Sequence, residues 1–298
     1  MEVGSPTIDQ LRIFLTVAEQ GSFNQAAKKL GRALSVISYG IAGLELQLGV
    51  RLFDREGSRR PALTDPGRAL LADARAVIDE VDGLMARARS VRQGLETELS
   101  LAVDVMVPSA IVAAILRDFQ VTFPTVDLRL HVEALGAVAA LVLDQRADLA
   151  VAGPDIIDLP ELQRTAIGSV QLIPVASPDH PLAQLEDIAP GEARRHLQLV
   201  LTDRSALTEN KEFSVISPRT WRLADLGAKH ALLLEGIGWG NMPRHVVTDE
   251  IHQGRLVELK LPENPPMDYL LHALWRKDTR LGPAASWMLD GLADRLPR

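Results

Sequence analysis

Cysteine is absent from all 298 residues of the sequence. This absence excludes disulfide bonds, thiolate nucleophiles and cysteine-ligated zinc, and it agrees with a reducing compartment. A metal ion would have to be held by carboxylates and histidines alone. We predict no metal site and no cofactor.

Long apolar segments are missing too. No apolar run reaches the roughly 18 residues of a membrane-spanning helix, and the first residues lack the basic and then apolar pattern of a secretory signal. We therefore expect a cytoplasmic protein that does not contact membranes. A hydrophobic content of 47% is enough for sizeable cores, and the length favours two domains plus a small module.

Short catalytic motifs are not found either. The seven histidines are scattered, with no pair four residues apart and no HExxH. There is no Gly-x-Ser-x-Gly elbow, no Gly-Lys-Ser/Thr phosphate loop and no GxGxxG after a strand. Asp148 begins an expected strand, which is more typical of a turn or cap than of a catalytic base. We expect no catalytic residues, so the protein is predicted not to be an enzyme.

Positive charge is scarce overall but concentrated locally. The net charge is −7, yet residues 24–60 hold seven basic and three acidic side chains, a local charge of +4. A basic patch binds phosphates by releasing counterions, while an acidic body discourages non-specific coating of DNA. The alternative is an ordinary solvated surface.

Two short helices are predicted ahead of this patch. Apolar residues at helical spacing indicate a helix over residues 7–19 that ends near a glycine. Ser22 can cap the second helix, with Gln25 completing a capping box. Gly31 ends that helix and begins a short turn, residues 31–34.

A third helix follows the turn. Its buried face is predicted to consist of Ile37, Ile41, Leu44 and Leu48. The same spacing puts Val36, Ser38, Tyr39, Gly40 and Gly43 nearer its exposed side. A helix, a tight turn and a second helix together form the motif that places a recognition helix in the DNA major groove.

Four segments make this region resemble the N-terminal domain of the LysR-type transcriptional regulators. They are AAKKLG (26–31), ISYGI (37–41), LELQLGVRLFDR (44–55) and LTDPGRALL (63–71). The resemblance covers about sixty residues and implies a winged helix-turn-helix. It also implies that Leu52 and Phe53 pack the wing on the helices, that Arg51 and Arg55 meet the sugar-phosphate backbone, and that Thr64 and Gly67 open the next helix.

This chain departs from the family where the recognition helix begins. Ala33-Leu34-Ser35 replaces the usual Ser-Gln pair, which removes a cap hydroxyl and a base-reading amide. Gly40 and Gly43 weaken the helix by about 1 kcal/mol each relative to alanine. We therefore expect unusual sequence preference or weak DNA binding, with Tyr39 either contacting DNA or only packing. The predicted DNA-binding residues are Lys28, Arg32, Leu34, Ser35, Val36, Ser38, Tyr39, Arg51, Arg55, Arg59 and Arg60.

A long helix with an apolar stripe is predicted next. Asp65-Pro66 is typical of a helix start and Gly94 of a helix end. Apolar residues spaced alternately four and three apart form a seam typical of helix dimers. The alternative is a helix packed within one chain. The residues of the seam are Leu70, Ala74, Val77, Val81, Leu84, Ala88 and Val91.

From residue 95 onward, short strand-like runs alternate with helical ones, which predicts an open α/β domain. Strands are expected at 99–105, 126–132, 148–153, 172–177 and 197–202, and helices at 111–123, 138–145 and 223–236. In such sheets ligands bind beyond the carboxyl ends of the strands. The residues there are Asp104, Met106, Pro108, Ser109, Leu135, Gly136, Gly153, Pro154, Asp155, Thr202, Asp203, Arg204 and Ser205.

The family resemblance implies a purpose for these loops. In LysR-type regulators this region resembles a periplasmic binding protein with two subdomains around an effector cleft. The implied division is residues 1–65 for DNA binding, 66–94 for the linker helix, and 95–298 for effector binding. Subdomain one would hold residues 95–169 and 268–298, and subdomain two residues 170–267. The GIGWGNMP segment resembles the loop that closes subdomain two, and it adds Gly236 and Ile237 to the effector residues.

Two charged side chains give a hypothesis about the effector. An ionised Asp104 would favour a cationic or hydrogen-donating group, whereas an Asp104 that caps the helix at Ser109 would say nothing of the ligand. Arg204 would meet an anionic group or pair with Asp203 in solvent. Together they favour a zwitterionic or nitrogen-rich metabolite.

We therefore predict a LysR-like, sequence-specific regulator of transcription. Its expected partners are double-stranded DNA with a near-palindromic operator, a small-molecule effector, a second copy of the chain, with a homotetramer favoured, and RNA polymerase. The alternative is a cytoplasmic small-molecule receptor whose DNA-binding head is weak or degenerate. A transport-type solute receptor fits residues 95–298 but not the head or the missing signal segment.

Overall fold

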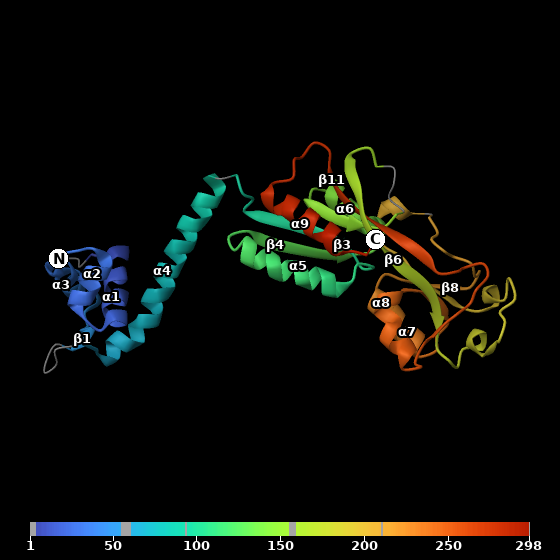
Figure 1. Cartoon of the computed structure of the whole chain (residues 1–298), viewed down its shortest axis with the longest axis horizontal. Helices are drawn as coiled ribbons and strands as arrows, with labels where there is room; N and C mark the ends of the chain where they lie inside the picture. Colours follow the sequence, from blue (N-terminus) through green and yellow to red (C-terminus); the bar gives the residue numbers. More distant parts are fainter. Residues whose placement is uncertain (1–3, 55–60, 93, 155–158, 210, 298) are drawn as a thin grey trace. The chain divides into compact units, whose positions relative to one another are not determined.

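The computed structural model describes residues 4–54, 61–92, 94–154, 159–209 and 211–297. The chain forms two compact units, Met1–Arg89 and Ser90–Arg298. We call the first unit the head and the second the C-terminal unit (Figure 1). Within the described residues, no helix has the length and apolar character needed to cross a membrane.

The head is a bundle of three helices with a two-stranded ribbon. The helices are α1 (Ile8–Gln20), α2 (Phe23–Leu30) and α3 (Leu34–Leu48), and the ribbon pairs β1 (Phe53–Asp54) with β2 (Ala62–Leu63). Helix α4 (Asp65–Arg92) follows, and its N-terminal half completes the same core. The predicted helix-turn-helix and the strands of a wing are therefore present.

Local sequence signals determine where the first helices begin and end. Thr7 and Gln10 form a reciprocal capping box at the start of α1, and Ser22 accepts a hydrogen bond from the Gln25 N–H at the start of α2. Gly21 and Gly31 end these helices in the left-handed conformation that glycine adopts without strain. Ala33 provides no side-chain cap for α3, as predicted.

The two glycines of α3 lie against α1 and not on the exposed side, so the prediction for Gly40 and Gly43 was wrong. A Cβ on Gly40 would come 2.7 Å from Cδ1 of Ile13, and one on Gly43 would come 2.8 Å from Nε2 of Gln10. The missing side chains let the two helices approach closely. Leu48 also differs from its predicted buried position, since it is 36% exposed.

The base of the wing is anchored in the head. Leu52 and Phe53 are buried, and the Phe53 ring meets Phe14 edge-on with their centroids 5.7 Å apart. Glu45 accepts hydrogen bonds from the backbone N–H groups of Leu52 (2.8 Å) and Phe53 (3.2 Å). The packing implied by the family resemblance is thus observed.

Helix α4 has two different apolar faces. Ala74 and Ile78 are buried in the head, and Leu70 packs partly buried beside them. Farther along, Val77, Leu84 and Val91 are 46%, 60% and 54% exposed, Ala88 is exposed, and Val81 is half-buried. Leu70 and Ala74 therefore serve the head. The remaining apolar stripe consists of Val77, Val81, Leu84, Ala88 and Val91.

In the residues that the structure describes, the C-terminal unit is built on a nine-stranded mixed sheet in the order β4-β3-β5-β11-β6-β9-β7-β8, with β10 paired to β6. The first five strands are β3 (Glu98–Asp104), β4 (Asp127–Glu133), β5 (Leu149–Ala152), β6 (Leu162–Ala176) and β7 (Gln198–Leu201). The others are β8 (Thr220–Leu223), β9 (Trp239–Pro243), β10 (Val257–Glu258) and β11 (Met267–Arg276).

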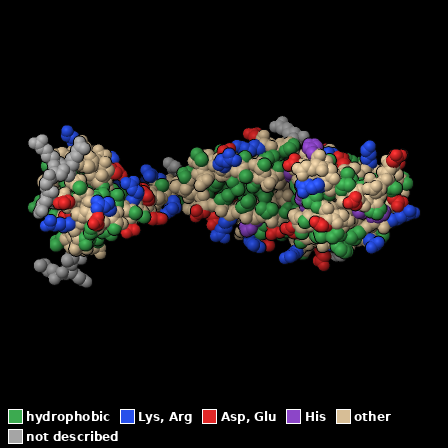
Figure 2. Space-filling model, turned by 90° about the horizontal axis from the view of Figure 1, so that it is seen from below, with side chains coloured by type: hydrophobic (Ala, Val, Ile, Leu, Met, Phe, Trp, Pro, Cys, Tyr) green, Lys and Arg blue, Asp and Glu red, His purple; other side chains and the backbone are tan. Residues whose placement is uncertain are grey.

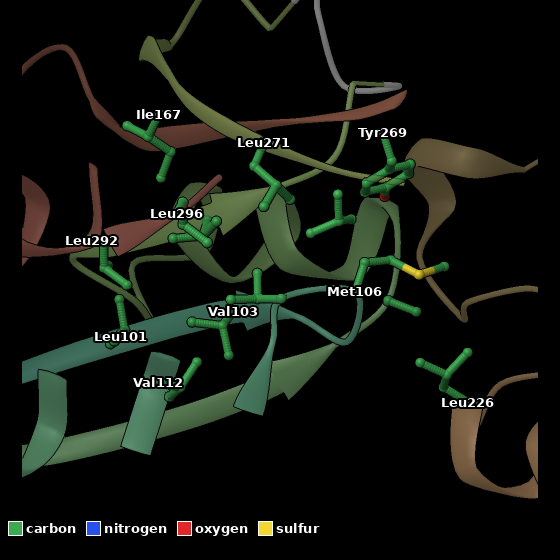
Figure 3. Close-up of a cluster of buried hydrophobic side chains, with 14 of the residues drawn as sticks. Leu101, Val103, Met106, Val112, Ile167, Leu226, Tyr269, Leu271, Leu292 and Leu296 are labelled. Carbon is green, nitrogen blue, oxygen red and sulfur yellow. The ribbon is translucent and has the colours of Figure 1, made fainter. Parts of the chain in front are cut away.

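Helices pack against this sheet. They are α5 (Ser109–Thr122), α6 (Gly136–Leu143), α7 (Leu226–Leu234), α8 (Arg244–His252) and α9 (Pro283–Arg295), with three short 3-10 turns between residues 181 and 208. One half of the sheet is formed around β3, β4 and β5 and the other around β7, β8 and β9. The main core runs through both halves. Figure 3 shows part of this core, including Val103, Leu271 and Leu292.

Two long strands join the halves of the sheet. Strand β6 pairs with β11 over Leu162–Leu172 and with β9 over Leu172–Ala176, so it continues from one half into the other. The β6–β11 ladder shifts its register between Leu271 and His272, near Gly168. Strand β6 therefore connects the two halves of the sheet without a break.

All five predicted strands are observed, as are the three predicted helices of this unit. The first half of β6, together with β8, β9, β10, β11, α8 and α9, was not predicted. The segment expected as a closing loop, residues 236–243, is a tight turn followed by β9. Its Trp239 is fully buried, and the indole N–H donates to the Ala193 carbonyl at 3.2 Å.

Candidate functional site

The exposed side of α3 carries the side chains predicted to read DNA. Leu34 and Val36 are each 43% exposed and Tyr39 is 82% exposed, so Tyr39 does not pack into the head. Ser35 is exposed, and Ser38 is half-buried. This face offers apolar groups, hydroxyls and one aromatic ring, which suits contact with thymine methyls and phosphates.

The basic side chains of the head differ in whether they form ion pairs with acidic side chains. Lys28 and Arg51 are exposed. Arg32 pairs with Asp9 of α1, with 2.5 Å between Nη1 and Oδ2. Lys29 and Arg75 both contact Glu19, and hydrogen bonds from them lower the pKa of that carboxyl. Figure 2 shows basic and acidic side chains intermingled on the head.

Arg55, Arg59 and Arg60 complete the predicted phosphate contacts, and they lie outside the described residues. The ribbon that leads to them is in place, because Phe53 pairs with Leu63 and Asp54 with Ala62. Thr64 ties the end of the ribbon to α4. Its hydroxyl donates to the Arg51 carbonyl and accepts from the Gly67 N–H.

A cavity of about 310 Å³ lies between the two halves of the C-terminal unit. We call it the effector cavity, after the ligand that the family resemblance implies. Met106, Leu135 and Pro154, which were predicted to bind the effector, line it from the strand ends of the first half. Residues of β6, β7, β9, β11 and α7, together with the segment 212–214, complete it. Figure 3 shows Met106 and Tyr269 approaching from separate elements. Its lining is more apolar than polar, and its polar side chains are those of Gln198, Glu212, Ser214, Lys229, Asn241 and Tyr269. A concave site with both kinds of group is typical of small-molecule binding.

Asp104, the sharpest prediction, does not line the effector cavity. The side chain is 1% exposed; Oδ1 accepts from the Met106 N–H at 2.8 Å and Oδ2 from the Tyr269 hydroxyl at 3.0 Å. Burial raises the pKa of Asp104 to about 6, although hydrogen bonds from Met106, Tyr269, Leu135 and Gly153 act in the opposite direction.

Both hypotheses for Asp104 therefore need correction. The carboxylate does not cap α5, since the cap position is Pro108 and no side chain bonds there. Both of its oxygens are also occupied by donors of the protein itself. The expectation of a cationic or nitrogen-rich effector loses its main support.

Gly153 explains how Tyr269 reaches Asp104. A Cβ on Gly153 would come 1.8 Å from the Tyr269 hydroxyl oxygen, so only glycine leaves room for the phenol. Tyr269 lies on β11, 165 residues along the chain from Asp104. The sequence alone gave no sign of this pair.

The remaining predicted effector residues lie elsewhere. Asp203 bonds to the N-terminus of α6, where Gly136 makes room for it. Thr202 and Arg204 line open grooves outside the cavity. Ser109 lines an apolar groove of about 470 Å³ between α5, β4 and α7. Gly236 and Ile237 form the turn before β9, with Ile237 packed on the core. Asp155 lies outside the described residues.

Lys229 is one of the cavity residues that the sequence did not predict, and the one with a buried charge. It lies on α7, is 3% exposed and donates from Nζ to the Asn241 carbonyl at 2.7 Å. Burial lowers the pKa of Lys229 to about 7. The available signal was its spacing, because Lys229 shares the buried face of α7 with Leu226 and Leu233.

No metal site is seen among the described residues, since they hold no cluster of three or more histidine or carboxylate side chains with suitable geometry. His180 and His196 lie close together, with ring centroids 5.2 Å apart. Burial, and then the neighbouring His196, lowers the pKa of His180 to about 4.

Two family models match this chain. The bacterial regulatory helix-turn-helix protein, lysR family, matches residues 8–68, and the LysR substrate binding domain matches residues 92–297. The chain is 29% identical over 288 residues to the probable HTH-type transcriptional regulator YhaJ of Escherichia coli K12, covering 95% of this chain and 94% of YhaJ. It is 32% identical over 263 residues to the probable nitrogen assimilation transcriptional activator of Synechococcus elongatus, covering 84% and 82%.

Solved structures share the fold. The Corynebacterium glutamicum OxyR C206 mutant aligns with a TM-score of 0.55 at 20% identity, covering 98% of this chain and 93% of that one. ArgP from Mycobacterium tuberculosis aligns with a TM-score of 0.55 at 22% identity, covering 97% and 98%.

Proposed function

Because the chain belongs to the LysR-type transcriptional regulators, with a helix-turn-helix domain for DNA and an effector-binding domain, we propose which surfaces perform each task. The head reads a near-palindromic operator in double-stranded DNA, the apolar stripe of α4 joins two chains, and the effector cavity binds the small molecule that controls them. The observation that carries this proposal is a cavity bounded by both halves of the C-terminal unit.

DNA recognition is assigned to the exposed side of α3 and to the wing. Val36 and Tyr39 project from the first turns of α3, where a recognition helix meets base edges. Lys28, Arg51, Arg55, Arg59 and Arg60 supply phosphate contacts, and Arg32 joins them when it leaves Asp9. Close packing of Gly40 and Gly43 on α1 argues against a degenerate head, because α3 is held in place despite its glycines.

Association of two chains is assigned to the apolar stripe of α4. Large apolar side chains on an exposed helix face favour burial against a partner. Leu84 and Val91 are more than half exposed, and Met85 beside them is 56% exposed. Two chains joined here present two heads, which requires two half-sites about one helical turn apart or a multiple of it. We further propose that two dimers form a tetramer and that the protein contacts RNA polymerase. We also propose that it is located in the cytoplasm.

The effector acts by favouring one arrangement of the two halves. We divide the C-terminal unit into subdomain one, residues 95–169 and 268–298, and subdomain two, residues 170–267. Both long strands, β6 and β11, pass between these subdomains. A ligand shifts an equilibrium only by its difference in affinity for the two states. A cavity lined from both subdomains provides such a difference.

A ligand screen with a blocked variant tests this assignment. Met267 lines the effector cavity and is 41% exposed, so Met267→Trp fills space without entering the core. Small molecules extracted from the source cells are expected to raise the melting temperature of the wild-type protein and change its DNA affinity. The variant should lose both responses. A ligand that acts equally on Met267→Trp would place the effector site elsewhere.

A further inference from the structure

Lys229 reaches the effector cavity because a glycine, Gly240, lies beside its side chain. Its aliphatic chain passes over Gly240 of β9, where a Cβ would come 3.0 Å from Cε of Lys229 and 2.6 Å from the Leu199 carbonyl oxygen. Gly240 therefore leaves a channel for the lysine. The ammonium reaches the cavity from α7. Lys229 as a whole residue is 3% exposed.

The protein itself provides few hydrogen-bond acceptors for this ammonium. A lysine ammonium has three hydrogen-bond donors, and its one hydrogen-bond partner among the described residues is the neutral carbonyl of Asn241, 2.7 Å away. In the described part of the chain, no carboxylate lies within ion-pair distance of Lys229. A buried charge without a counter-ion is strongly disfavoured.

Polar and charged groups near Lys229 already interact with other residues. Glu212 also lines the cavity, but its carboxylate pairs with Arg222. Tyr269 donates its hydroxyl to Asp104 on the other side of the cavity. On the surface of α7 next to Lys229, His230 faces Glu250 of α8, with 3.6 Å between Nε2 and Oε1. None of these groups neutralises Lys229.

We propose that Lys229 binds an anionic group of the effector, and that the effector is a small, mostly apolar organic molecule with a single carboxylate. This inference rests on the effector cavity assigned above and replaces the expectation of a zwitterionic or nitrogen-rich ligand. The single cationic group matches one carboxylate. The apolar lining, which includes Met106, Leu199 and Phe213, matches an apolar body.

Proton uptake on ligand binding distinguishes a Lys229 that binds the carboxylate from a Lys229 that only stabilises the fold. Burial lowers the pKa of Lys229 to about 7, so the amine is mostly neutral at pH 8. A carboxylate bound beside it favours the charged form and raises this pKa. Binding should therefore take up about one proton at pH 8 and almost none at pH 6.

The experiment uses matched sets of probes with the full chain. Benzoate, phenylacetate and hexanoate are compared with the corresponding amides and amines by isothermal titration calorimetry, in buffers of different ionisation enthalpy. The variant Lys229→Met keeps the length and apolar character of the side chain, and Lys260→Met removes an exposed lysine as a control. The wild-type proton uptake needs no variant, so it holds even if Lys229→Met folds poorly.

We expect at least one carboxylate to bind about tenfold more tightly than its amide, with uptake at pH 8, and Lys229→Met to lose this preference while Lys260→Met keeps it. Equal or tighter binding of amides or amines would overturn the proposal, as would a carboxylate preference that survives in Lys229→Met. Failure of every carboxylate to bind at millimolar concentration would overturn it as well. If an amide or amine binds and Met267→Trp blocks it, the effector cavity stands and only the role of Lys229 falls.

Discussion

Asp203 accepts a 2.7 Å hydrogen bond from the backbone N–H of Ala137, so a side chain following β7 bonds to the first turn of α6. Helix α6 has no cap of its own, because Leu135 occupies the cap position with φ +51° and makes no side-chain bond. Gly136 allows the approach, since a Cβ there would come 2.4 Å from Oγ of Ser205. The two halves of the C-terminal unit are thus joined by a carboxylate at a helix N-terminus.

Removing this carboxylate should weaken the C-terminal unit. We expect Asp203→Ala to lower the free energy of unfolding by about 1–2 kcal/mol, the usual effect of losing a helix cap. Urea unfolding followed by circular dichroism measures the change. Glu209→Gln, an exposed acid on the same segment, serves as the control. Equal stability of Asp203→Ala and the wild type would show that the bond contributes nothing.

Two glycines of α4 should respond to alanine in opposite ways. A Cβ on Gly67 would come 2.2 Å from the Leu52 carbonyl oxygen, whereas Gly83 has only the Arg87 guanidinium nearby, at 3.7 Å. We expect Gly67→Ala to destabilise the head by about 2 kcal/mol or more. Gly83→Ala should stabilise it by up to about 1 kcal/mol through helix propensity. Thermal unfolding measures both, and a stabilised Gly67→Ala would contradict the close contact between Gly67 and the Leu52 carbonyl.

A charge in the apolar stripe of α4 should separate the chains. Leu84 is 60% exposed in one chain, so Leu84→Asp should not disturb the fold but would bury a carboxylate in a dimer. Sedimentation velocity is expected to show loss of the dimer with an unchanged circular dichroism spectrum. Ala72→Asp, exposed on another side of α4, should remain dimeric. A dimer that persists in Leu84→Asp would remove the stripe from the interface.

Asp104 should give the stability a specific pH dependence. Its pKa in the folded protein, about 6, lies above the unfolded value of about 3.9. The folded state therefore holds its proton more tightly, and the contribution to stability is greatest below pH 4 and lost as the pH rises to 6. Urea unfolding between pH 4 and 7 should show this decline relative to Asp104→Asn. Parallel curves for the two proteins would contradict it.

Arginines of the wing should contribute to the salt dependence of DNA binding. We expect Arg55→Ala and Arg59→Ala each to weaken binding nearly equally across sequences and to reduce the slope against log salt by about 0.9 per lost phosphate contact. Fluorescence anisotropy with a labelled duplex measures the slope. Arg129→Ala in the C-terminal unit provides the control. An unchanged slope in both wing variants would exclude the wing from phosphate binding.

Much of the head could be predicted because its signals are local. Thr7, Ser22 and the glycines that follow α1 and α2 determine helix ends within a few residues of sequence. The positions of Gly40 and Gly43 were mistaken for a different reason. Helical periodicity gives the direction of a residue around the helix axis, but it does not show how closely a neighbouring helix approaches. A Cβ at Gly40 would clash with Ile13 of α1, and a Cβ at Gly43 would displace the amide of Gln10.

The effector cavity was predictable only in part. Strand ends indicated Met106, Leu135 and Pro154, because ligands bind at such ends in any open α/β sheet. Asp104 was misjudged since Tyr269, which bonds to it, lies far along the chain on a strand that was not predicted. Lys229 was missed because a lysine in a helix is normally solvated. The packing of α7 against β6, β7, β8 and β9 places that lysine inside the protein.

Selection of genomic DNA tests the central claim most directly. The purified full chain is incubated with fragmented DNA from its source genome at about physiological salt, and the retained fragments are sequenced, with Leu84→Asp processed in parallel. The account predicts enrichment of an interrupted palindrome by the wild-type protein and a strong loss of enrichment in the variant. Retention of fragments without any common sequence would contradict specific recognition by α3.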